Sequence, residues 1–280
     1  MIPFDFDYYR PDTVHEASQL FAHLDSGQKD PLYFGGGTEI ITFARNQSIH
    51  TKAVIDLKAI PECHAIDFSG GRLIIGACVS LTRVADSGLF PLLGKSCTGI
   101  ADHTAQGKIT IGGNVCGRII YHEALLPLLL TDCTVVTASQ HGLRQVPIWR
   151  IFDKQLRLSR GEFIVRFIID KSYLQLPYIH VKRTRIAKID YPLISMAAIN
   201  TDGRIRVAFS GLCSFPFRSP ELEEDLNEED LPYAARVRNA IANIPAPLLN
   251  NQAGTPEYRR FVLSAILMNT LETHNEVDYV

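Results

Sequence analysis

Two glycine-rich segments contain the residue types that best suit the binding of an anion. The first covers residues 33–40 (YFGGGTEI) and the second covers residues 110–114 (TIGGN). Glycine permits a positive φ and a close approach of the backbone, so that successive N–H groups can converge on a phosphate. Thr38 and Thr110 place a hydroxyl donor beside these amides. Two such segments fit a ligand with two phosphates, and ordinary turns are the alternative.

Neither segment matches the common nucleotide-binding motifs. No Lys-Ser or Lys-Thr pair follows the glycines, as a Walker A loop requires. Neither reads G-x-G-x-x-G at the start of a helix with an acidic residue about twenty positions further on, which disfavours a Rossmann site. No Ser-His-Asp arrangement or carboxylate pair recurs, so no residue is assigned a catalytic role.

The six cysteines are spread along the chain without a Cys-x-x-Cys pair. Their spacing fits neither a zinc site nor a compact iron–sulfur cluster, and no metal-binding residue is assigned. Unclustered thiols are typical of the reducing cytoplasm.

The overall charge is close to neutral, with 28 basic and 30 acidic residues among 280 and a formal net charge of -2. This balance disfavours nucleic acid and anionic membranes as partners. The amino-terminal sequence MIPFDFDYYRPD is acidic, whereas a signal peptide begins with a cationic region. The apolar stretches 124–130 and 163–169 are far shorter than the roughly 20 residues that cross a bilayer. We therefore expect a cytoplasmic protein with no membrane partner.

The pattern of apolar residues predicts the elements that position the two glycine segments. Helical spacing predicts a helix over 13–24, and short strands are predicted after it at 31–34 and 53–57. These elements form a β–α–β unit that contains the first segment. Further strands are predicted at 72–75, 77–80, 134–138 and 163–169, and further helices at 82–85, 90–100 and 124–130.

The composition changes between residues 170 and 176, which indicates a boundary. Beyond it, strands are predicted at 179–181, 193–198 and 205–209, and helices at 233–244 and 257–271. The acidic segment 219–230 is interpreted as a solvated loop. A run of strands followed by a run of helices indicates a small α+β domain at the carboxyl end.

Several motifs together resemble those of a known family, the FAD-binding medium subunits of the molybdenum hydroxylases. This family contains the flavoproteins of xanthine dehydrogenase and carbon monoxide dehydrogenase. Residues 6–11 resemble its F-x-Y-x-R-P segment, residues 35–40 resemble its first pyrophosphate loop, and residues 110–114 match its T/S-I-G-G-N loop. Later parts of the chain that resemble family motifs are 162–167, with Ile164 at a Leu position, 182–194, 211–218 and 257–260. The resemblance covers almost the whole chain, in order.

Two departures from the family pattern affect the expected site. Residues 106–109 (QGKI) stand where the family has R-N-x-A/G before the second loop. Ala124 occupies the position, three before Pro127, where the family has an Asp that contacts the flavin nucleotide. Glu123 is the candidate replacement for that carboxylate. The chain lacks clustered cysteines, so the resemblance implies FAD without an additional iron–sulfur cluster.

The resemblance implies a fold and a set of site residues. The fold is α+β, with a two-lobed FAD-binding domain of the vanillyl-alcohol-oxidase (PCMH) type over residues 1–172 and a small α+β carboxyl-terminal domain over 173–280. Lobe 1 covers about residues 1–58 and lobe 2 about 59–172, with FAD between them. The implied cofactor-binding residues are Tyr33, Phe34, Gly35, Gly36, Gly37, Thr38, Glu39, Ile40, Thr110, Ile111, Gly112, Gly113, Asn114, Glu123, Ile164 and Lys182.

The resemblance also implies a function within a hetero-oligomer. In the family, a molybdopterin-binding large subunit oxidises the substrate and a 2Fe–2S small subunit relays electrons to FAD. We expect a xanthine dehydrogenase type, active in purine catabolism, with NAD+ as the electron acceptor. Lys182 is expected to stabilise negative charge on the reduced flavin or on a phosphate. The alternatives are a stand-alone flavoprotein oxidoreductase of the same fold and a non-enzymatic scaffold subunit that has lost FAD.

Overall fold

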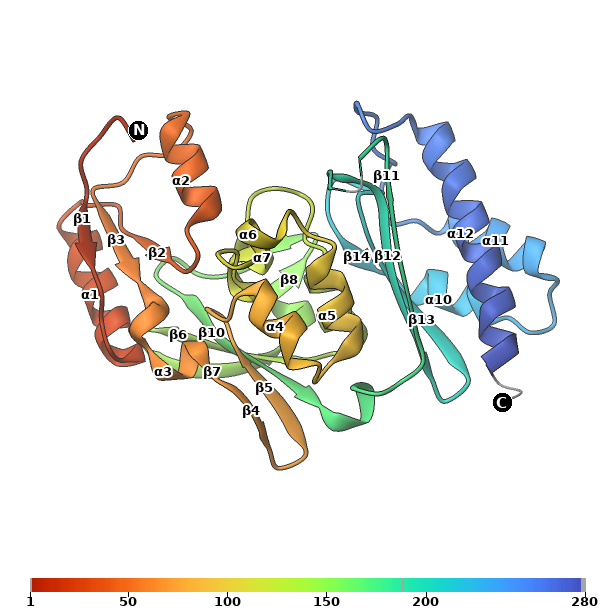
Figure 1. The fold of residues 1–280 in the computed structure, drawn as a ribbon, viewed down its shortest axis with the longest axis horizontal. Helices are drawn as coiled ribbons and strands as arrows, with labels where there is room; N and C mark the ends of the chain where they lie inside the picture. Colours follow the sequence, from red (N-terminus) through yellow and green to blue (C-terminus); the bar gives the residue numbers. More distant parts are fainter. Residues whose placement is uncertain (1, 188, 278–280) are drawn as a thin grey trace.

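A small parallel sheet begins the fold. The computed structural model describes residues 2–187 and 189–277. Strands β1 (Asp7–Tyr9), β3 (Ala53–Asp56) and β2 (Leu32–Phe34) pair in that order, all in parallel. Helix α1 (Val14–Ser26) packs on β3, as its apolar spacing predicts, and α2 (Thr38–Arg45) follows β2 (Figure 1). The expected β–α–β unit is therefore confirmed.

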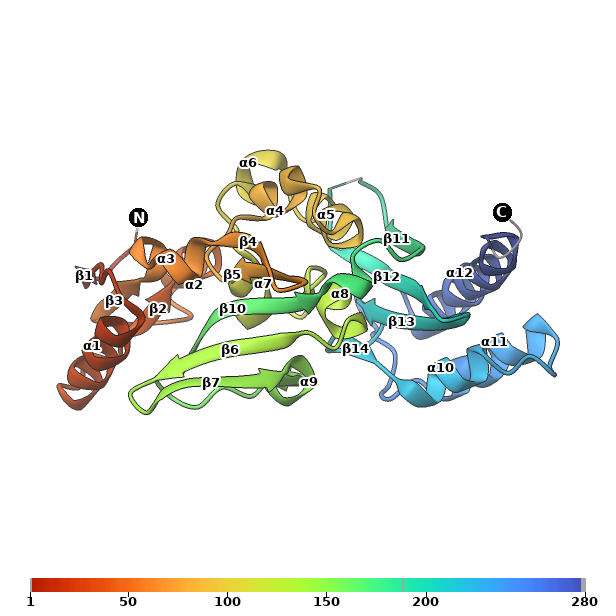
Figure 2. The same cartoon turned by 90° about the horizontal axis from the view of Figure 1, so that it is seen from below.

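A five-stranded antiparallel sheet forms the middle of the molecule, in the order β4-β5-β10-β6-β7. Its strands are β4 (Ile66–Ser69), β5 (Arg72–Gly76), β6 (Thr134–Ser139), β7 (Gly142–Pro147) and β10 (Phe163–Asp170), and a two-stranded ribbon is formed by β8 (Phe152–Asp153) and β9 (Gln155–Leu156). The helices of this part are α3 (Pro61–His64), α4 (Leu81–Ser87), α5 (Pro91–Thr98), α6 (His103–Gln106), α7 (Ile111–Cys116), α8 (Leu125–Leu130) and α9 (Ile148–Ile151), with short 3₁₀ turns at Leu57–Ala59 and Lys171–Tyr173. Figure 2 shows helices α4 to α6 above one face of the sheet and β7 along its outer edge.

The carboxyl-terminal part is a four-stranded antiparallel sheet with helices. The sheet order is β11-β12-β13-β14, and the three helices follow the last strand in the chain. Its elements are β11 (Tyr178–Thr184), β12 (Pro192–Thr201), β13 (Arg204–Ser210), β14 (Phe217–Arg218), α10 (Pro220–Leu226), α11 (Tyr233–Ala242) and α12 (Pro256–Val277). The prediction of strands followed by helices is confirmed here.

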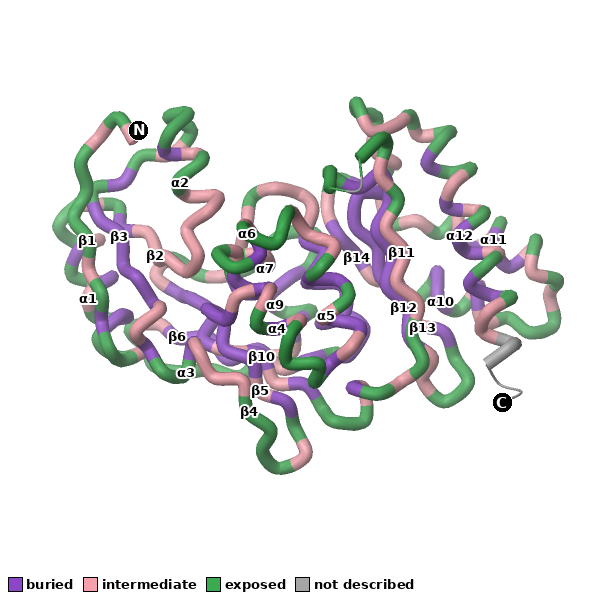
Figure 3. The backbone as a smooth tube through the Cα atoms, in the orientation of Figure 1, coloured by how far each residue is buried: buried purple, intermediate pink, exposed green. Residues whose placement is uncertain are grey.

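The buried apolar residues form three clusters, two of which extend from one part of the molecule into the next. One fills the space around α1, one lies between the middle sheet and its helices, and one lies between the last sheet and helices α10 to α12. Figure 3 shows the buried backbone concentrated in the central strands β10, β12 and β13. The cluster around α1 includes Val136 and Phe163 of the middle sheet, and the middle cluster includes Ala197 of β12, so the division near residues 58 and 172 stays a proposal.

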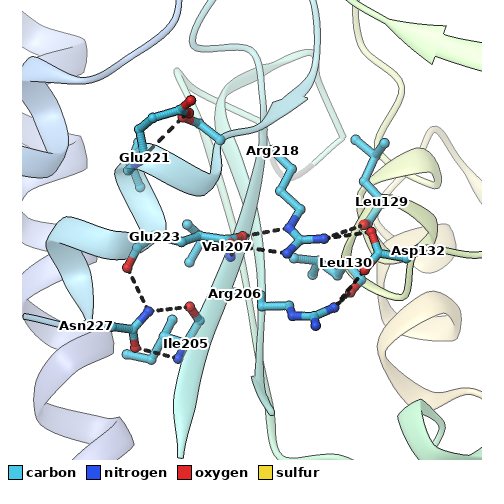
Figure 4. A network of polar contacts seen from close by, with 12 residues as sticks. Leu129, Leu130, Asp132, Ile205, Arg206, Val207, Arg218, Glu221, Glu223 and Asn227 are labelled. Atoms are coloured by element: carbon cyan, nitrogen blue, oxygen red, sulfur yellow. Dashed lines mark hydrogen bonds and ion pairs between the residues drawn. The ribbon is translucent and has the colours of Figure 1, made fainter. Parts of the chain in front are cut away.

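A polar network joins the last sheet to the middle of the molecule (Figure 4). Asp132, which follows α8, accepts hydrogen bonds from Arg218 at 2.8 Å and from Arg206 at 2.9 Å. Arg218 also forms a bidentate ion pair with Glu223 of α10, with N···O distances of 2.8 and 3.0 Å. Paired donors of this kind fix orientation as well as distance. These contacts therefore fix the position of the carboxyl-terminal sheet relative to α8.

Three expectations about local structure were wrong. Residues 77–80 do not form a strand, since Ser80 makes only an isolated bridge to Thr110. The second glycine segment is the first turn of α7 and not an open turn, because the Thr110 hydroxyl caps it. The acidic segment is not simply a solvated loop: Ser219 caps α10, and the helix buries Leu222, Leu226 and Glu223.

In the part of the chain that the structure describes, no helix is both long enough and apolar enough to cross a membrane.

Candidate functional site

A cavity of about 550 Å³ lies where the three parts of the molecule meet. This volume is within the range of about 300–1,000 Å³ that is typical of sites for cofactors and small ligands. Its lining comes from residues 33–42, 100–123 and 182–191. Twelve of the sixteen expected site residues line it: Tyr33, Gly35, Gly36, Gly37, Thr38, Glu39, Ile40, Thr110, Gly113, Asn114, Glu123 and Lys182.

The first glycine segment opens α2 onto this cavity. Gly37 precedes the helix with φ 71° and ψ 0°, a left-handed conformation that favours glycine. The first intrahelical hydrogen bond runs from the Ile41 N–H to the Gly37 carbonyl at 2.8 Å. The amides of residues 38–40 therefore have no acceptor within the helix, and the helix dipole adds positive potential at the same end. This geometry suits an anion such as a phosphate.

Glycines in the first segment also allow the two segments to pack against each other. A Cβ on Gly36 would lie 1.8 Å from the Lys108 carbonyl oxygen, and a Cβ on Gly35 would lie 2.9 Å from the Thr110 hydroxyl. A side chain at Gly36 is excluded because the backbone of Lys108 cannot yield by this amount. The close packing of the two segments therefore requires glycine in the same segment whose geometry suits an anion.

The expectation that the second segment offers free amides is wrong. The N–H groups of Ile111 and Gly112 donate to the carbonyls of Val79 and Ala77, at 2.9 and 2.8 Å. Those of Gly113 and Asn114 are bound within the segment itself, to the hydroxyl and carbonyl of Thr110. An anion in the cavity is therefore met mainly by the first segment, together with polar side chains of the second.

Four expected site residues lie outside the cavity lining. A Cβ on Gly37 would collide with the ring of Phe34, so this ring packs directly against Gly37 and supports the loop. Ile111 is fully buried, and a Cβ on Gly112 would lie 2.6 Å from that of Ala77, so both pack against the chain after β5. Ile164 is buried in the middle core on β10, opposite Thr137. These four residues support the fold and do not line the cavity.

Glu39 connects the two lobes. Its carboxylate accepts the N–H of Arg118 at 2.6 Å and the N–H of Ile119 at 3.2 Å. Because Glu39 lies in the first turn of α2, the contact ties that helix to the chain that follows α7. The position of the first segment is thereby fixed relative to the second.

Glu123 and Lys182 form a buried ion pair at 2.9 Å in the wall of the cavity. The side chains are only 4% and 11% exposed. Lys182 also donates to the Gly99 carbonyl at 2.7 Å, and the Ser195 hydroxyl donates to Glu123 at 2.5 Å. Burial raises the pKa of Glu123, and Lys182 and Ser195 oppose this rise by stabilising the carboxylate. The pair links the middle of the molecule to the carboxyl-terminal sheet.

His122 lies beside this pair but faces the second segment. Burial lowers the pKa of its imidazole and so favours the neutral form. Its Nδ1 lies 2.6 Å from the Asn114 carbonyl oxygen, which can only accept, so Nδ1 carries the proton. His122 is thus a hydrogen-bonded residue that supports the second segment.

Lys58, which sequence reasoning missed, supports the first glycine segment without lining the cavity. Its ammonium donates to the Gly35 carbonyl at 2.9 Å and to Asp56 at 2.7 Å, and it lies 4.6 Å from the centroid of the Phe34 ring. Asp56 is buried and also accepts a hydrogen bond from the hydroxyl of Tyr8. Burial alone would raise the pKa of Asp56, but the hydrogen bonds from Lys58 and Tyr8 outweigh it and lower the pKa. Lys58 therefore connects the first glycine segment to the edge of the small sheet.

The described residues, 2–187 and 189–277, contain no group of three or more His, Cys, Asp or Glu side chains placed to hold a metal ion.

The fold and the cavity define a class: mixed α/β proteins in which a glycine-rich helix start opens onto a cavity of cofactor size. Comparison with known proteins narrows this class. Residues 4–171 match the family model described as "FAD binding domain in molybdopterin dehydrogenase". The chain belongs to this family.

Individual relatives agree with this assignment. The chain is 23% identical over 222 residues to the nicotinate dehydrogenase FAD-subunit of Eubacterium barkeri, covering 75% of this chain and 72% of that one. It is 30% identical over 151 residues to the carbon monoxide dehydrogenase medium chain of Hydrogenophaga pseudoflava, covering 52% of each. Its fold is similar to that of a chain of quinoline 2-oxidoreductase from Pseudomonas putida 86, with a TM-score of 0.86 and 20% identity over 99% of this chain and 98% of that one. The expected family and the mixed α/β architecture are confirmed.

Proposed function

We propose that this chain is the FAD-binding, electron-transfer subunit of a multi-subunit molybdenum hydroxylase. The observation that carries the proposal is the cavity, which joins the open end of α2 to a family-matched second segment. The partners are a molybdopterin-binding large subunit and a 2Fe–2S small subunit, in a cytoplasmic hetero-oligomer. The finer proposal is a xanthine dehydrogenase type that serves purine catabolism and delivers electrons to NAD+.

The described residues fit FAD. The amides of residues 38–40 and the Thr110 hydroxyl would hold the pyrophosphate, while the buried cation of Lys182 lies in the wall of the same cavity. The apolar side chains Ile100, Ile109 and Ile189 provide contact surface for a ring system. When bound, FAD supplies the redox chemistry, and the protein supplies binding, orientation and electrostatics.

Filling the cavity tests whether the chain binds FAD. A Cβ on Gly113 would lie 2.9 Å from the Thr110 hydroxyl and meet nothing else within 4 Å, so Gly113→Leu requires a small shift of that side chain but does not strike the backbone, and residue 113 lines the cavity. We expect this variant to retain its melting temperature within a few degrees and to lose at least 90% of its bound flavin, on the order of a tenfold loss of affinity. Flavin absorbance of the purified protein measures the loss.

Gly107→Leu is the matched control, because Gly107 is exposed, does not line the cavity and has only ordinary contacts around its Cβ position. It should keep a full complement of FAD. A colourless wild-type chain that takes up no added FAD would contradict the proposal. Unchanged activity of the whole complex with Gly113→Leu would favour the scaffold alternative, and turnover without partner chains would favour the stand-alone oxidoreductase.

Lys58→Met should weaken FAD binding on the order of tenfold, because it removes the charged donor that holds the Gly35 carbonyl, and with it the first segment, in position. The loss of Lys58 leaves the Gly35 carbonyl and the buried Asp56 without this donor. Fluorescence titration of the apoprotein with FAD measures the effect, and Lys58→Arg should restore most of the affinity. The exposed Lys52 provides the control, Lys52→Met. Riboflavin affinity should not change, because riboflavin lacks the phosphates that the first segment would hold.

A further inference from the structure

The strand β7 leaves one edge of the middle sheet open. In the order β4-β5-β10-β6-β7 it pairs only with β6, and Figure 2 shows no described helix or strand beyond it. Open edges present unpaired backbone groups to which an extended segment of another chain can add. Leu143, on β7 itself, is 61% exposed. An apolar side chain on an open edge is unusual for a strand that faces only water.

The helix that follows β7 exposes the chain's single tryptophan. Trp149 of α9 is 53% exposed, and the Arg150 guanidinium lies 5.2 Å from its ring centroid. Tryptophan and arginine are the residue types most enriched among the energetic centres of protein interfaces. Helix α9 directly follows β7 in the chain and contacts it, so Trp149 lies close to the open edge of the sheet.

The surrounding segment is cationic within a chain of nearly neutral charge. Residues 140–160 contain Arg144, Arg150, Lys154, Arg157 and Arg160 but only one acidic residue, Asp153. Arg144, Arg157 and Arg160 form ion pairs within the chain. Among the described residues, Arg150 and Lys154 have no carboxylate partner and lie beside aromatic rings. In this segment two cations are therefore available to a partner: Arg150, beside Trp149, and Lys154, in the turn between β8 and β9 beside Phe215.

We propose that the surface formed by β7 and α9 docks an extended, acidic segment of a partner subunit. The inference rests on the proposed function, since the partner is taken from the same complex. A second copy of this chain is disfavoured, because symmetric pairing would place the same cations opposite each other. Nucleic acid is disfavoured because two unpaired cations are far fewer than its backbone requires. Pairing along β7 would supply the main-chain hydrogen bonds, and Arg150 and Lys154 would meet the acidic side chains.

The position of β7 also indicates that a chain docked there lies away from the cavity. The second glycine segment joins the sheet next to β5, because Gly112 donates to Ala77, and β7 lies three strands away. At about 4.8 Å between strands, this separation is roughly 14 Å. A chain docked on β7 would therefore hold the complex together without touching the cavity.

The test uses the tagged full-length chain expressed in its own host, with iron, molybdenum and FAD measured in the purified complex. The double variant Trp149→Glu/Arg150→Glu should keep its FAD and lose at least tenfold of its co-purifying iron, molybdenum or both. Phe68→Glu is the matched control, because Phe68 is 50% exposed on β4, at the opposite edge of the same sheet. It should leave the metal content unchanged. Leu143→Glu gives an independent single variant, with the melting temperature as a check on folding.

Hydrogen exchange provides a direct second measurement. The amides of residues 142–147 should exchange at least tenfold more slowly in the complex than in the isolated full-length chain. Retention of both metals by the double variant, or equal exchange in the two states, would overturn the inference. So would a homodimer, or bound nucleic acid, that the double variant abolishes. A wild-type chain that co-purifies with neither metal would instead count against the proposed function.

Discussion

Replacing Glu123 with alanine is expected to lower the free energy of unfolding by about 3–5 kcal/mol, because it leaves a buried cation without its partner. Lys182 is 11% exposed, and its remaining hydrogen bond, to the Gly99 carbonyl, cannot neutralise the charge. Ser195 loses its acceptor in the same substitution. Denaturant unfolding monitored by circular dichroism measures the change.

The double variant Glu123→Gln/Lys182→Met separates the cost of a broken pair from the contribution of the pair itself. Replacing both charges by neutral side chains of similar size should recover most of the stability, since buried pairs contribute little net free energy. The single variants Lys182→Met and Glu123→Gln complete the cycle, and each should be destabilised, as Glu123→Ala is. Stability losses that simply add, with no recovery in the double variant, would contradict this account of the pair.

FAD binding should respond differently from stability. If Lys182 contributes to holding the cofactor, the double variant folds but binds FAD more weakly than the wild type. The departure from the family pattern at Ala124 then has a physical explanation. Glu123, one position earlier, holds Lys182 in the wall of the cavity.

The sequence predicted best where local periodicity alone determines an element. Helix α1 follows from apolar residues at helical spacing, and the Thr13 side chain caps it by accepting a hydrogen bond from the Glu16 N–H. The acidic segment contained equivalent signals, a Ser219 cap followed by Pro220 with Leu222 and Leu226 on one face, but its charge obscured them. The cap, the proline and the apolar face of this segment therefore indicate a helix in spite of its acidic charge.

Other parts of the site depend on contacts that no local pattern reveals. Glycine disfavours a helix, so α7 could not be expected from its sequence, and it forms because Gly112 can approach Ala77 closely. Lys58 follows an ordinary strand and reaches Gly35 only because β2 and β3 pair in parallel. Motif spacing alone suggests Ile164 as a site residue, but it is buried like its neighbours Phe163 and Val165, because β10 is the central strand of the middle sheet.

Arg259→Met is expected to destabilise the carboxyl-terminal part by about 3–5 kcal/mol, because it leaves several buried oxygens without a donor. Arg259 begins the second turn of α12 and is fully buried. Its guanidinium donates to the carbonyls of Leu193, Gly211 and Leu249 and to the side chain of Asn251. These acceptors come from three separate segments, which a methionine of similar length cannot join.

Arg260→Met is the control for this prediction, since Arg260 is exposed and adjacent in the chain. It should change the free energy of unfolding by less than about 0.5 kcal/mol. The Arg259 variant should also affect the cavity at a distance. Asn251 donates to the hydroxyl of Tyr121, which lines the cavity and stacks on Tyr191 at 4.7 Å. Loss of stability without any change in FAD affinity would show that Arg259 supports the helix alone, whereas a joint loss would show that the carboxyl-terminal helix helps to shape the cofactor site.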